Sequence, residues 1–191
     1  MPNTEIVTVN LQGMYHDILR DAQGHVIWDR GWQKNSIVVD CHILLAGLMR
    51  GDSSMPGIQG LEVGTGSPAW DQPPGLPQSS NTQTSLVDPH PYTVHLNDPQ
   101  TPVKMDYIDI GTGNVSNSPT EKLQIVVTLG PGIPNWPEPN DPNPPHPTAT
   151  LREFGLIGTL GNTTRLINYV THSAIVKDPT STLERIIWLT F

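Results

Sequence analysis

The feature that most restricts the fold is a proline-rich stretch from residue 130 to 149. It reads Gly-Pro-Gly-Ile-Pro-Asn-Trp-Pro-Glu-Pro-Asn-Asp-Pro-Asn-Pro-Pro-His-Pro-Thr-Ala and holds eight of the chain's 20 prolines. Proline fixes φ and has no amide hydrogen, so the stretch favours an extended polyproline conformation and cannot pair within a sheet. A connection this long is unusual in a compact domain unless it is functional, disordered or held by a neighbour. We therefore predict an arm or a linker here.

A second stretch, from residue 67 to 85, has the same character. It is polar and contains Pro68, Pro73, Pro74 and Pro77. Proline is confined to the edges of sheets because it cannot donate a ladder hydrogen bond. This stretch is therefore predicted to be a long loop and not a core strand.

Composition limits the class of protein further. The chain has 191 residues, among them 17 glycines, 20 prolines and one cysteine, and a net charge of −8. The length predicts a single domain spanning 1–191, and the Pro and Gly content excludes a long-helix protein. The negative charge argues against nucleic acid as a partner, and no apolar stretch approaches the roughly 18 residues of a membrane span. We expect a soluble protein made in the cytosol, without membrane insertion or an intrachain disulfide.

Outside the two proline-rich stretches, the chain is a series of short apolar segments typical of β-strands. One segment alone favours a helix, from Asp40 to Met49, where Asp40 could cap the first turn and Gly51 could end the last. A hairpin turn is predicted at Asp21–Gly24. The sequence thus predicts a mainly β protein, an antiparallel β-sandwich of two sheets with one short α-helix and long proline-rich loops. The expected strands cover residues 6–9, 15–19, 25–28, 61–63, 92–96, 103–110, 123–129, 151–158, 165–171, 173–177 and 183–191.

The last of these strands is apolar on both faces between Ile186 and Phe191, except at Thr190. Such a strand is expected in the middle of the core, because an apolar edge would invite aggregation. We therefore expect Trp188 to be buried, with a cost of about 3 to 5 kcal/mol on its replacement by alanine.

Few residues suggest catalysis or metal binding. Asp88, His90, His95 and Asp98 are close in sequence and could hold a divalent cation if the chain folded back, but the prolines among them favour a surface turn. The two Gly-Thr-Gly segments, at 64–66 and 111–113, do not continue into a phosphate-binding motif and are predicted to be plain turns. Cys41 is expected to be buried and inert. No cofactor, metal or catalytic residue is assigned.

Two tryptophans lie inside the proline-rich loops, Trp70 in the first and Trp136 in the second. They could line a sugar-binding or peptide-binding groove, or pin each loop to its own domain or to a neighbouring subunit. We favour the pinning role and predict that Trp70, Trp136, Pro137 and Pro139 form subunit contacts.

Several short segments resemble structural proteins of phage tails. They are Asn35–Val38 before the helix with Leu-Leu-Ala-Gly-Leu-Met, Leu61–Gly66, Leu151–Gly158, Leu166–Asn168, His172, Ile175–Lys177, Leu183 and the closing Ile-Ile-Trp-Leu-Thr-Phe. The family concerned is the tail-fibre collar and baseplate-associated class, with its relatives in phage-tail-like contractile injection systems. The resemblance implies a homo-oligomer, a trimer or hexamer, that joins other tail or baseplate proteins in a virion tail or an extracellular phage-tail-like particle assembled in the host cytoplasm.

The function expected from the sequence is therefore that of a non-enzymatic structural or adaptor subunit. Two alternatives stay open: a carbohydrate-binding module for receptor recognition, and a small metal-dependent hydrolase using Asp88, His90, His95 or Asp98.

Overall fold

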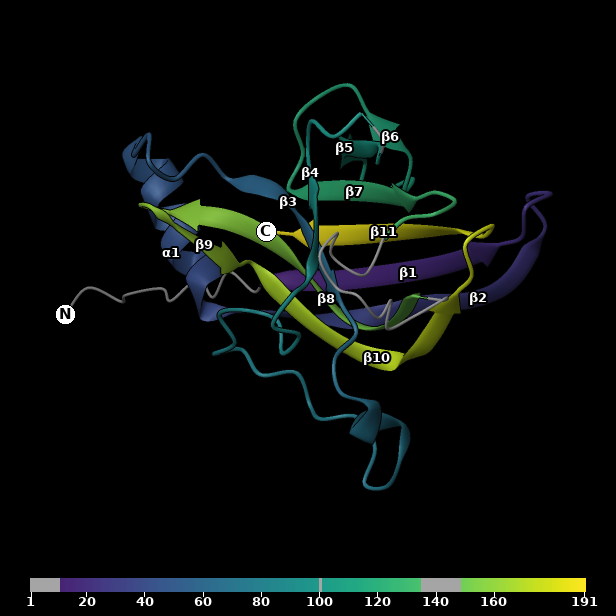
Figure 1. The fold of residues 1–191 in the computed structure, drawn as a ribbon. Helices are drawn as coiled ribbons and strands as arrows, with labels where there is room; N and C mark the ends of the chain where they lie inside the picture. Colours follow the sequence, from purple (N-terminus) through teal and green to yellow (C-terminus); the bar gives the residue numbers. More distant parts are fainter. Residues whose placement is uncertain (1–10, 100, 135–148) are drawn as a thin grey trace.

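The computed structural model describes residues 11–99, 101–134 and 149–191, and Figure 1 shows their arrangement. The expected strand at 6–9 and most of the second proline-rich stretch lie outside the described residues. The elements are β1 Gln12–Arg20, β2 Val26–Ile37, α1 Val39–Arg50, β3 Ile58–Gly64, the 3-10 turn η1 Pro68–Asp71, β4 Tyr92–His95, β5 Val103–Ile108, β6 Val115–Ser116, β7 Lys122–Leu129, β8 Ala149–Leu160, β9 Thr163–Leu166, β10 Asn168–Lys177 and β11 Thr182–Thr190.

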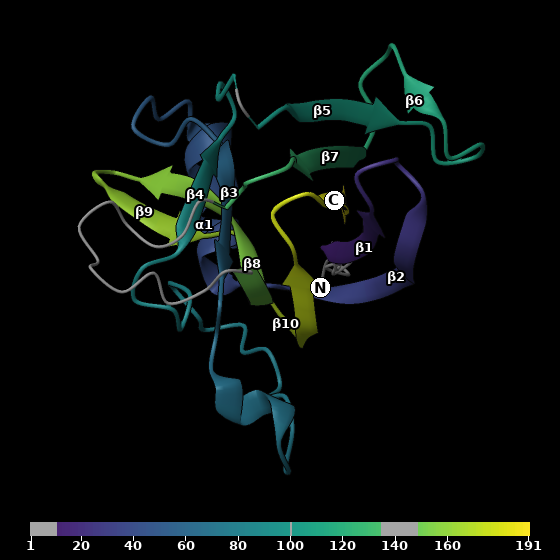
Figure 2. The same ribbon diagram turned by 45° about the vertical axis from the view of Figure 1, so that its right-hand side comes forward.

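The strands form one antiparallel sheet in the order β4-β3-β8-β10-β2-β1-β11-β7-β5-β6, with β9 paired to β8. The prediction of a mainly β, antiparallel protein with one α-helix is confirmed. The two layers expected from the sequence are, however, two halves of a single curled sheet. β4, at one end of the sheet, directly precedes β5, next to the other end, in chain order, and the two ribbon views show the curl of the sheet (Figures 1 and 2).

The two halves of the sheet join at a narrow point between β10 and β2. Only Asn168 with Ile37 and Tyr169 with Ser36 are paired there. The fully buried Asn168 side chain supports the join, since its Nδ2 donates to Asn35 Oδ1 at 2.8 Å and its Oδ1 accepts from the Leu156 amide at 2.5 Å. A short ladder with side-chain hydrogen bonds lets the sheet change direction while both ends of the Asn168 amide stay paired.

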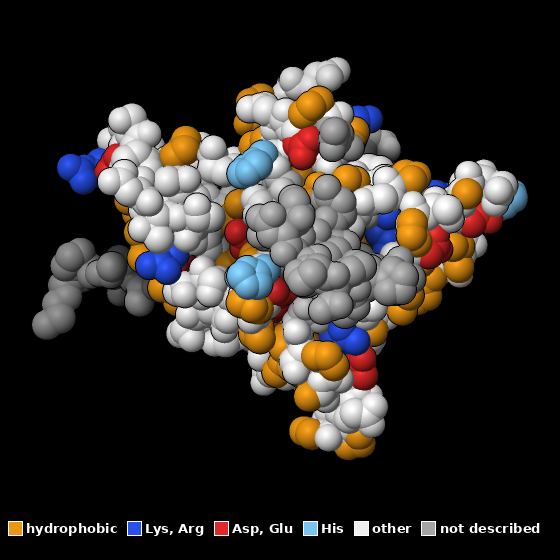
Figure 3. All heavy atoms as spheres, in the orientation of Figure 1, with side chains coloured by type: hydrophobic (Ala, Val, Ile, Leu, Met, Phe, Trp, Pro, Cys, Tyr) orange, Lys and Arg blue, Asp and Glu red, His pale blue; other side chains and the backbone are white. Residues whose placement is uncertain are grey.

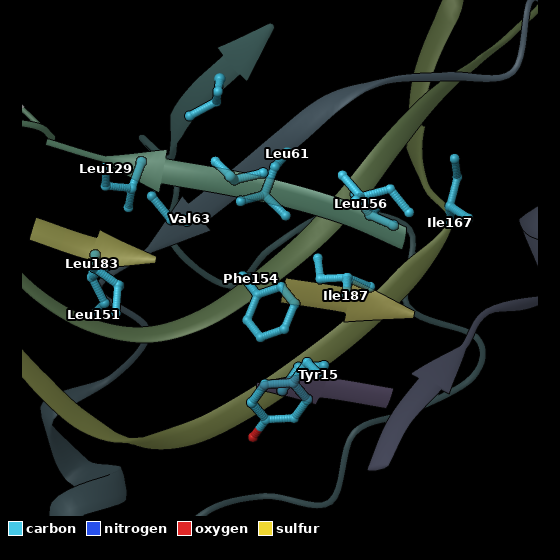
Figure 4. Packing of buried hydrophobic residues seen from close by; sticks show 14 of the residues in the cluster. Tyr15, Leu61, Val63, Leu129, Leu151, Phe154, Leu156, Ile167, Leu183 and Ile187 are labelled. Atoms are coloured by element: carbon cyan, nitrogen blue, oxygen red, sulfur yellow. The ribbon is translucent and has the colours of Figure 1, made fainter. Parts of the chain in front are cut away.

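The space between the two halves is filled by apolar side chains from nearly every large strand (Figure 4). Phe154 and Tyr15 lie at its centre, with ring centroids 5.1 Å apart in an edge-to-face arrangement. Alternation along the strands produces this core, because every second side chain of β1, β7 and β11 is buried and its neighbours face outward.

The glycines expected to form a hairpin turn and to end the helix do so. Gly24 has a φ of 85° in the hairpin turn, and Gly51 ends α1 with a φ of 74°. The expected cap at Asp40 was wrong, because the helix starts one residue earlier and its N-cap is Val38, whose side chain has no capping oxygen. Asp40 lies in the first turn, with its carboxylate 3.9 Å from Arg165 Nε.

β11 lies in the middle of the sheet between β1 and β7, as predicted. The expected burial of Trp188 was wrong. Leu183, Arg185, Ile187 and Leu189 point into the core, and Trp188 faces the outer side of the sheet, where it is half-buried.

The first proline-rich stretch contains no β-strand, as predicted, and two neighbouring residues of β8 hold its ends. Arg152 Nη2 donates to Asp71 Oδ2 at 2.6 Å at the beginning of the loop. Glu153, which is fully buried, accepts from the amides of Val87 at 3.0 Å and Asp88 at 2.7 Å at the end of the loop. The loop is therefore fixed to the sheet at both ends.

Candidate interaction surfaces

The first candidate surface lies on the outer face of β2, β1, β11 and β7. Strand pairing places Trp32 opposite His16, and places Trp188 between Met14 on β1 and Gln124 on β7. We call Trp32, His16, Trp188 and Lys122 the aromatic cluster.

The Trp188 ring is the centre of the aromatic cluster. Its centroid lies 3.9 Å from that of Trp32, with 30° between the ring planes, and the Lys122 ammonium lies 3.3 Å from the Trp188 centroid. Trp188 Nε1 donates to Gln124 Oε1 at 2.9 Å. Desolvation lowers the pKa of Lys122. A cation beside an indole ring is a favourable contact that fixes both side chains.

This geometry bears on the sugar-binding alternative. Trp32 reaches Trp188 from β2, on the far side of β1, and Lys122 reaches it from β7 on the other side of β11, so the two faces of the Trp188 ring are both covered. A sugar could stack on Trp188 only by displacing one of these side chains. The ring as it lies is better suited to contact with a protein surface.

The edge of the aromatic cluster is held by a histidine and a carboxylate. His16 Nε2 and Asp29 Oδ1 are 2.6 Å apart, and the His16 ring lies 5.3 Å from that of Trp32. The hydrogen bond from His16 is the main cause of a lowered pKa of Asp29, and the amide of Gly31 adds to it. The pair orients the His16 ring against Trp32.

The second candidate surface is the outer side of α1. Cys41, Leu44 and Gly47 are buried, and the close approach of Met55 leaves no room for a side chain at Gly47. On the other side, residues spaced by three and four positions share one stripe. We call Val39, Ile43, Ala46 and Met49 the helix stripe; Val39 and Ile43 are almost half exposed and Met49 is 90% exposed.

Apolar side chains are also exposed elsewhere. Val26 and Ile27 are more than half exposed in the hairpin that joins β1 and β2. Figure 3 shows hydrophobic side chains on this hairpin, at the right of the view, and on the lower protrusion that carries η1.

Of the four predicted interface residues, only Trp70 is described. It lies in η1, and its ring packs so closely on Gly66 that a side chain there would clash with it. Trp70 thus contacts its own loop, and its contact with another subunit stays a prediction. Trp136, Pro137 and Pro139 lie outside the described residues.

The acidic and histidine residues of the metal-binding alternative do not gather into a site. Asp88 Oδ2 accepts from the Thr65 amide at 2.7 Å and from its hydroxyl at 2.8 Å, and Oδ1 accepts from the His90 amide at 2.9 Å. Within the described ranges, no group of three His, Cys, Asp or Glu residues could hold a metal ion. Asp88 therefore holds the end of the first proline-rich loop against Thr65.

Of the two Gly-Thr-Gly segments, the second is a turn as predicted, whereas the first is the end of β3 at Gly64 followed by irregular chain; in both, an aspartate accepts hydrogen bonds from the threonine. Asp88 binds Thr65 in the first, and Asp109 Oδ1 accepts from the amide and hydroxyl of Thr112 in the second. Cys41 is buried, as predicted, and burial raises its pKa to about 11, so its thiol stays protonated at neutral pH.

The sequence reasoning missed both candidate surfaces. Trp32 follows Gly31 and Arg30 in a segment without clear alternation, so its pairing with His16 was not evident. The helix stripe had a visible signal, since α1 has apolar residues on all sides and such a helix is normally buried all round.

Neither a family model, a curated protein nor a solved structure matches the chain. Of the helices in the described residues, none has the length and apolar character needed to cross a bilayer.

Proposed function

We propose that this chain is a non-enzymatic structural subunit that assembles with copies of itself and with other proteins of a phage tail, a baseplate or a related contractile injection particle. The observation that carries this proposal is the helix stripe on α1. A virion tail or an extracellular tail-like particle, assembled in the host cytoplasm, is its proposed location.

The helix stripe is unusual for the surface of a monomer. A helix on a globular protein normally carries polar residues on its outer side, and an apolar outer side is typical of an interface. Met49 is 90% exposed, and Val39 and Ile43 in the same stripe are almost half exposed. Covering these side chains would remove apolar area from water, which favours association.

The aromatic cluster supports the same proposal. Tryptophan and methionine are enriched in protein interfaces, and interface residues that lose most binding energy on replacement are often tryptophans. Trp32 and Met14 lie beside Trp188 on one face of the sheet, and the contacts of Trp188 with Trp32 and Lys122 hold this ring in place before a partner arrives. Less side-chain entropy is then lost on binding.

The kind of assembly is proposed from the resemblance to collar and baseplate-associated tail proteins. That resemblance includes the α1 segment and the part of β11 that carries Trp188, so the resembling segments and the candidate surfaces overlap in part.

The test is the mass of the purified protein by light scattering over a range of concentrations. The wild-type chain is expected to form a trimer or hexamer. The double variant Ile43→Glu/Met49→Glu should have a lower mass, because buried carboxylates would oppose association. Asn114→Glu/Asn117→Glu is the matched control, since it adds the same charge at two exposed residues near β6 that are not part of α1.

A monomer at all concentrations, or equal masses for both variants, would contradict the role of the helix stripe. Glycan binding that is lost in Trp32→Ala would favour the carbohydrate-binding alternative instead.

A further inference from the structure

A cluster of charged side chains lies inside the curled sheet, apart from both candidate surfaces. We call Asp17 on β1, Arg30 on β2, His172 on β10 and Arg185 on β11 the arginine cluster. Asp17, His172 and Arg185 are at most 1% exposed. The Arg185 guanidinium lies 3.7 Å from the centroid of the Phe154 ring, and that of Arg30 lies 5.9 Å from the centroid of Tyr15.

Two irregularities in strand pairing bring side chains into this cluster. On β2, Arg30 and Gly31 together lie opposite Asp17, because the register shifts between the pairs His16–Trp32 and Ile18–Asp29. Gly31 has a φ of 66°, which a glycine tolerates. On β10, residues 172–174 lie opposite Arg152 alone, which turns His172 inward. Bulges of this kind redirect side chains and are common beside functional sites.

Asp17 and Arg185 form an ion pair with each other. Arg185 Nε donates to Asp17 Oδ1 at 2.6 Å, and its Nη2 donates to Asp17 Oδ2 at 2.8 Å. The same Nη2 lies 3.2 Å from His172 Nε2, and His172 Nδ1 lies 2.9 Å from the carbonyl of Ser173. A neutral His172 with its proton on Nδ1 satisfies both contacts, donating to Ser173 and accepting from Arg185.

The charges in the cluster do not balance. Asp17 offsets one of the two arginines, and among the residues that the structure describes no carboxylate forms an ion pair with Arg30. Arg30 Nη1 and Arg185 Nη1 are both buried atoms, and neither has a hydrogen-bond partner within the described part of the chain. One positive charge thus has no counter-ion in the cluster, and two N–H-bearing nitrogens, one on the buried Arg185 and one on the partly exposed Arg30, are withdrawn from water without a partner, which is costly.

We propose that the arginine cluster binds a singly charged carboxylate between Arg30 and Arg185. One negative charge would balance the cluster, whereas a phosphate dianion would leave it negative. A carboxylate has two oxygens that can accept from two guanidinium groups, which is the geometry that arginine recognises best. Water could accept the same hydrogen bonds but would leave the charge unbalanced.

The test uses thermal unfolding of the full chain in sodium formate, against sodium chloride at the same ionic strength. The wild-type protein should show a melting temperature that rises with the logarithm of formate concentration, by about 3 to 6 °C at ten times the dissociation constant of formate. Arg30→Met should lose this rise, because Asp17 and Arg185 then balance each other. Arg50→Met, at an exposed arginine of α1, is the matched control and should keep it.

Equal stabilisation by chloride and formate, or a rise that persists in Arg30→Met, would overturn the proposal. A wild-type protein insensitive to formate would do the same. If Arg30→Met does not fold, Arg30→Lys keeps the charge without the guanidinium fork and should bind formate at least about tenfold more weakly by calorimetry. Unchanged affinity in Arg30→Lys would also count against the site.

The carboxylate could come from a free acid or from an acidic side chain of an assembled neighbour. Light scattering with saturating formate distinguishes the two sources. An unchanged mass identifies a free acid, and a fall in mass that is absent in Arg30→Met identifies the neighbour's side chain.

Discussion

Asp17 and Arg185 face each other across the β1–β11 ladder, 168 residues apart in the chain, and form two hydrogen bonds inside the core. Burial raises the pKa of Asp17, but the charge and hydrogen bonds of Arg185 outweigh burial and hold that pKa below its usual value. The pair therefore stays ionised and links the first and last strands of the described fold.

Removing one partner of this pair should strongly destabilise the fold. Asp17→Asn is expected to lower the free energy of unfolding by about 3 to 5 kcal/mol, because it leaves the Arg185 charge buried without its counter-ion. Chemical denaturation measures this. Asp40→Asn is the control, since its contact with Arg165 is long and partly exposed and should be worth less than about 1 kcal/mol. Similar losses in the two variants would mean that the buried pair has no special role.

Acid should destabilise the fold through His172. Burial, with the Arg185 charge as the next cause, lowers the His172 pKa from 6.5 to about 3. Between these values the unfolded chain binds a proton that the folded chain does not, so stability falls as pH falls through this window. The slope for one proton is about 1.4 kcal/mol per pH unit. His172→Gln should remove that slope in denaturation measured from pH 7 to 4; a variant with the wild-type slope would exclude His172 as the cause.

The ionisation of Lys177 should change the stability of the fold in alkaline solution. Its buried ammonium donates to the carbonyls of Gly130 at 2.7 Å and Ser181 at 2.8 Å, and burial lowers its pKa to about 8. Above pH 8 the folded chain releases this proton first, so stability from this group rises with pH up to the unfolded pKa near 10.5. The difference in unfolding free energy between wild type and Lys177→Met should therefore move in favour of wild type from pH 8 to 10. A constant difference would contradict the assignment.

Trp188 and Ile187 offer a comparison on one strand. Ile187 is fully buried and Trp188 lies outside, so Ile187→Ala should cost about 2 to 5 kcal/mol and Trp188→Ala about 1 to 2 kcal/mol. If the aromatic cluster is an interface, Trp188→Ala should also reduce the assembled mass more than its small loss of stability explains. A larger loss of stability in Trp188→Ala than in Ile187→Ala would place Trp188 in the core.

Anchoring of the first proline-rich loop can be tested by proteolysis. No Lys or Arg lies between Arg50 and Lys104, so a protease of broad specificity is needed. Glu153→Gln weakens the charge-assisted hydrogen bonds to Val87 and Asp88, and new cleavage is expected between residues 77 and 90. Glu184→Gln, on the outer face of β11, should leave the cleavage pattern unchanged. Equal patterns in both variants would show that Glu153 does not hold the loop.

Local features of the fold were predictable from the sequence. The Asp21–Gly24 turn and the end of α1 at Gly51 depend on residues next to each other in the chain. The orientation of β11 was not predictable from its pattern. Arg185 and Trp188 are on opposite faces, and a reader would place tryptophan inside and arginine outside. The reverse holds because Asp17, far away in the sequence, supplies the counter-ion.

The candidate sites were harder to foresee for the same reason. Trp32 and Trp188 meet only because β1 pairs with both of their strands, and Arg30 turns inward only because of a bulge against Asp17. The predicted contacts of Trp136, Pro137 and Pro139 fall outside the described residues and stay predictions.

The positions of Arg152 and Glu153 have a consequence for how this chain can be altered. Between the Asp71 anchor and the next contact, at the Pro77 carbonyl with Thr171, the loop exposes Gln72, Pro73 and Pro74. Lengthening a loop whose ends are already fixed adds little closure entropy. An epitope tag or fluorescent label inserted among these three residues would leave the strand register intact. It could then be used to locate the protein inside the proposed particle.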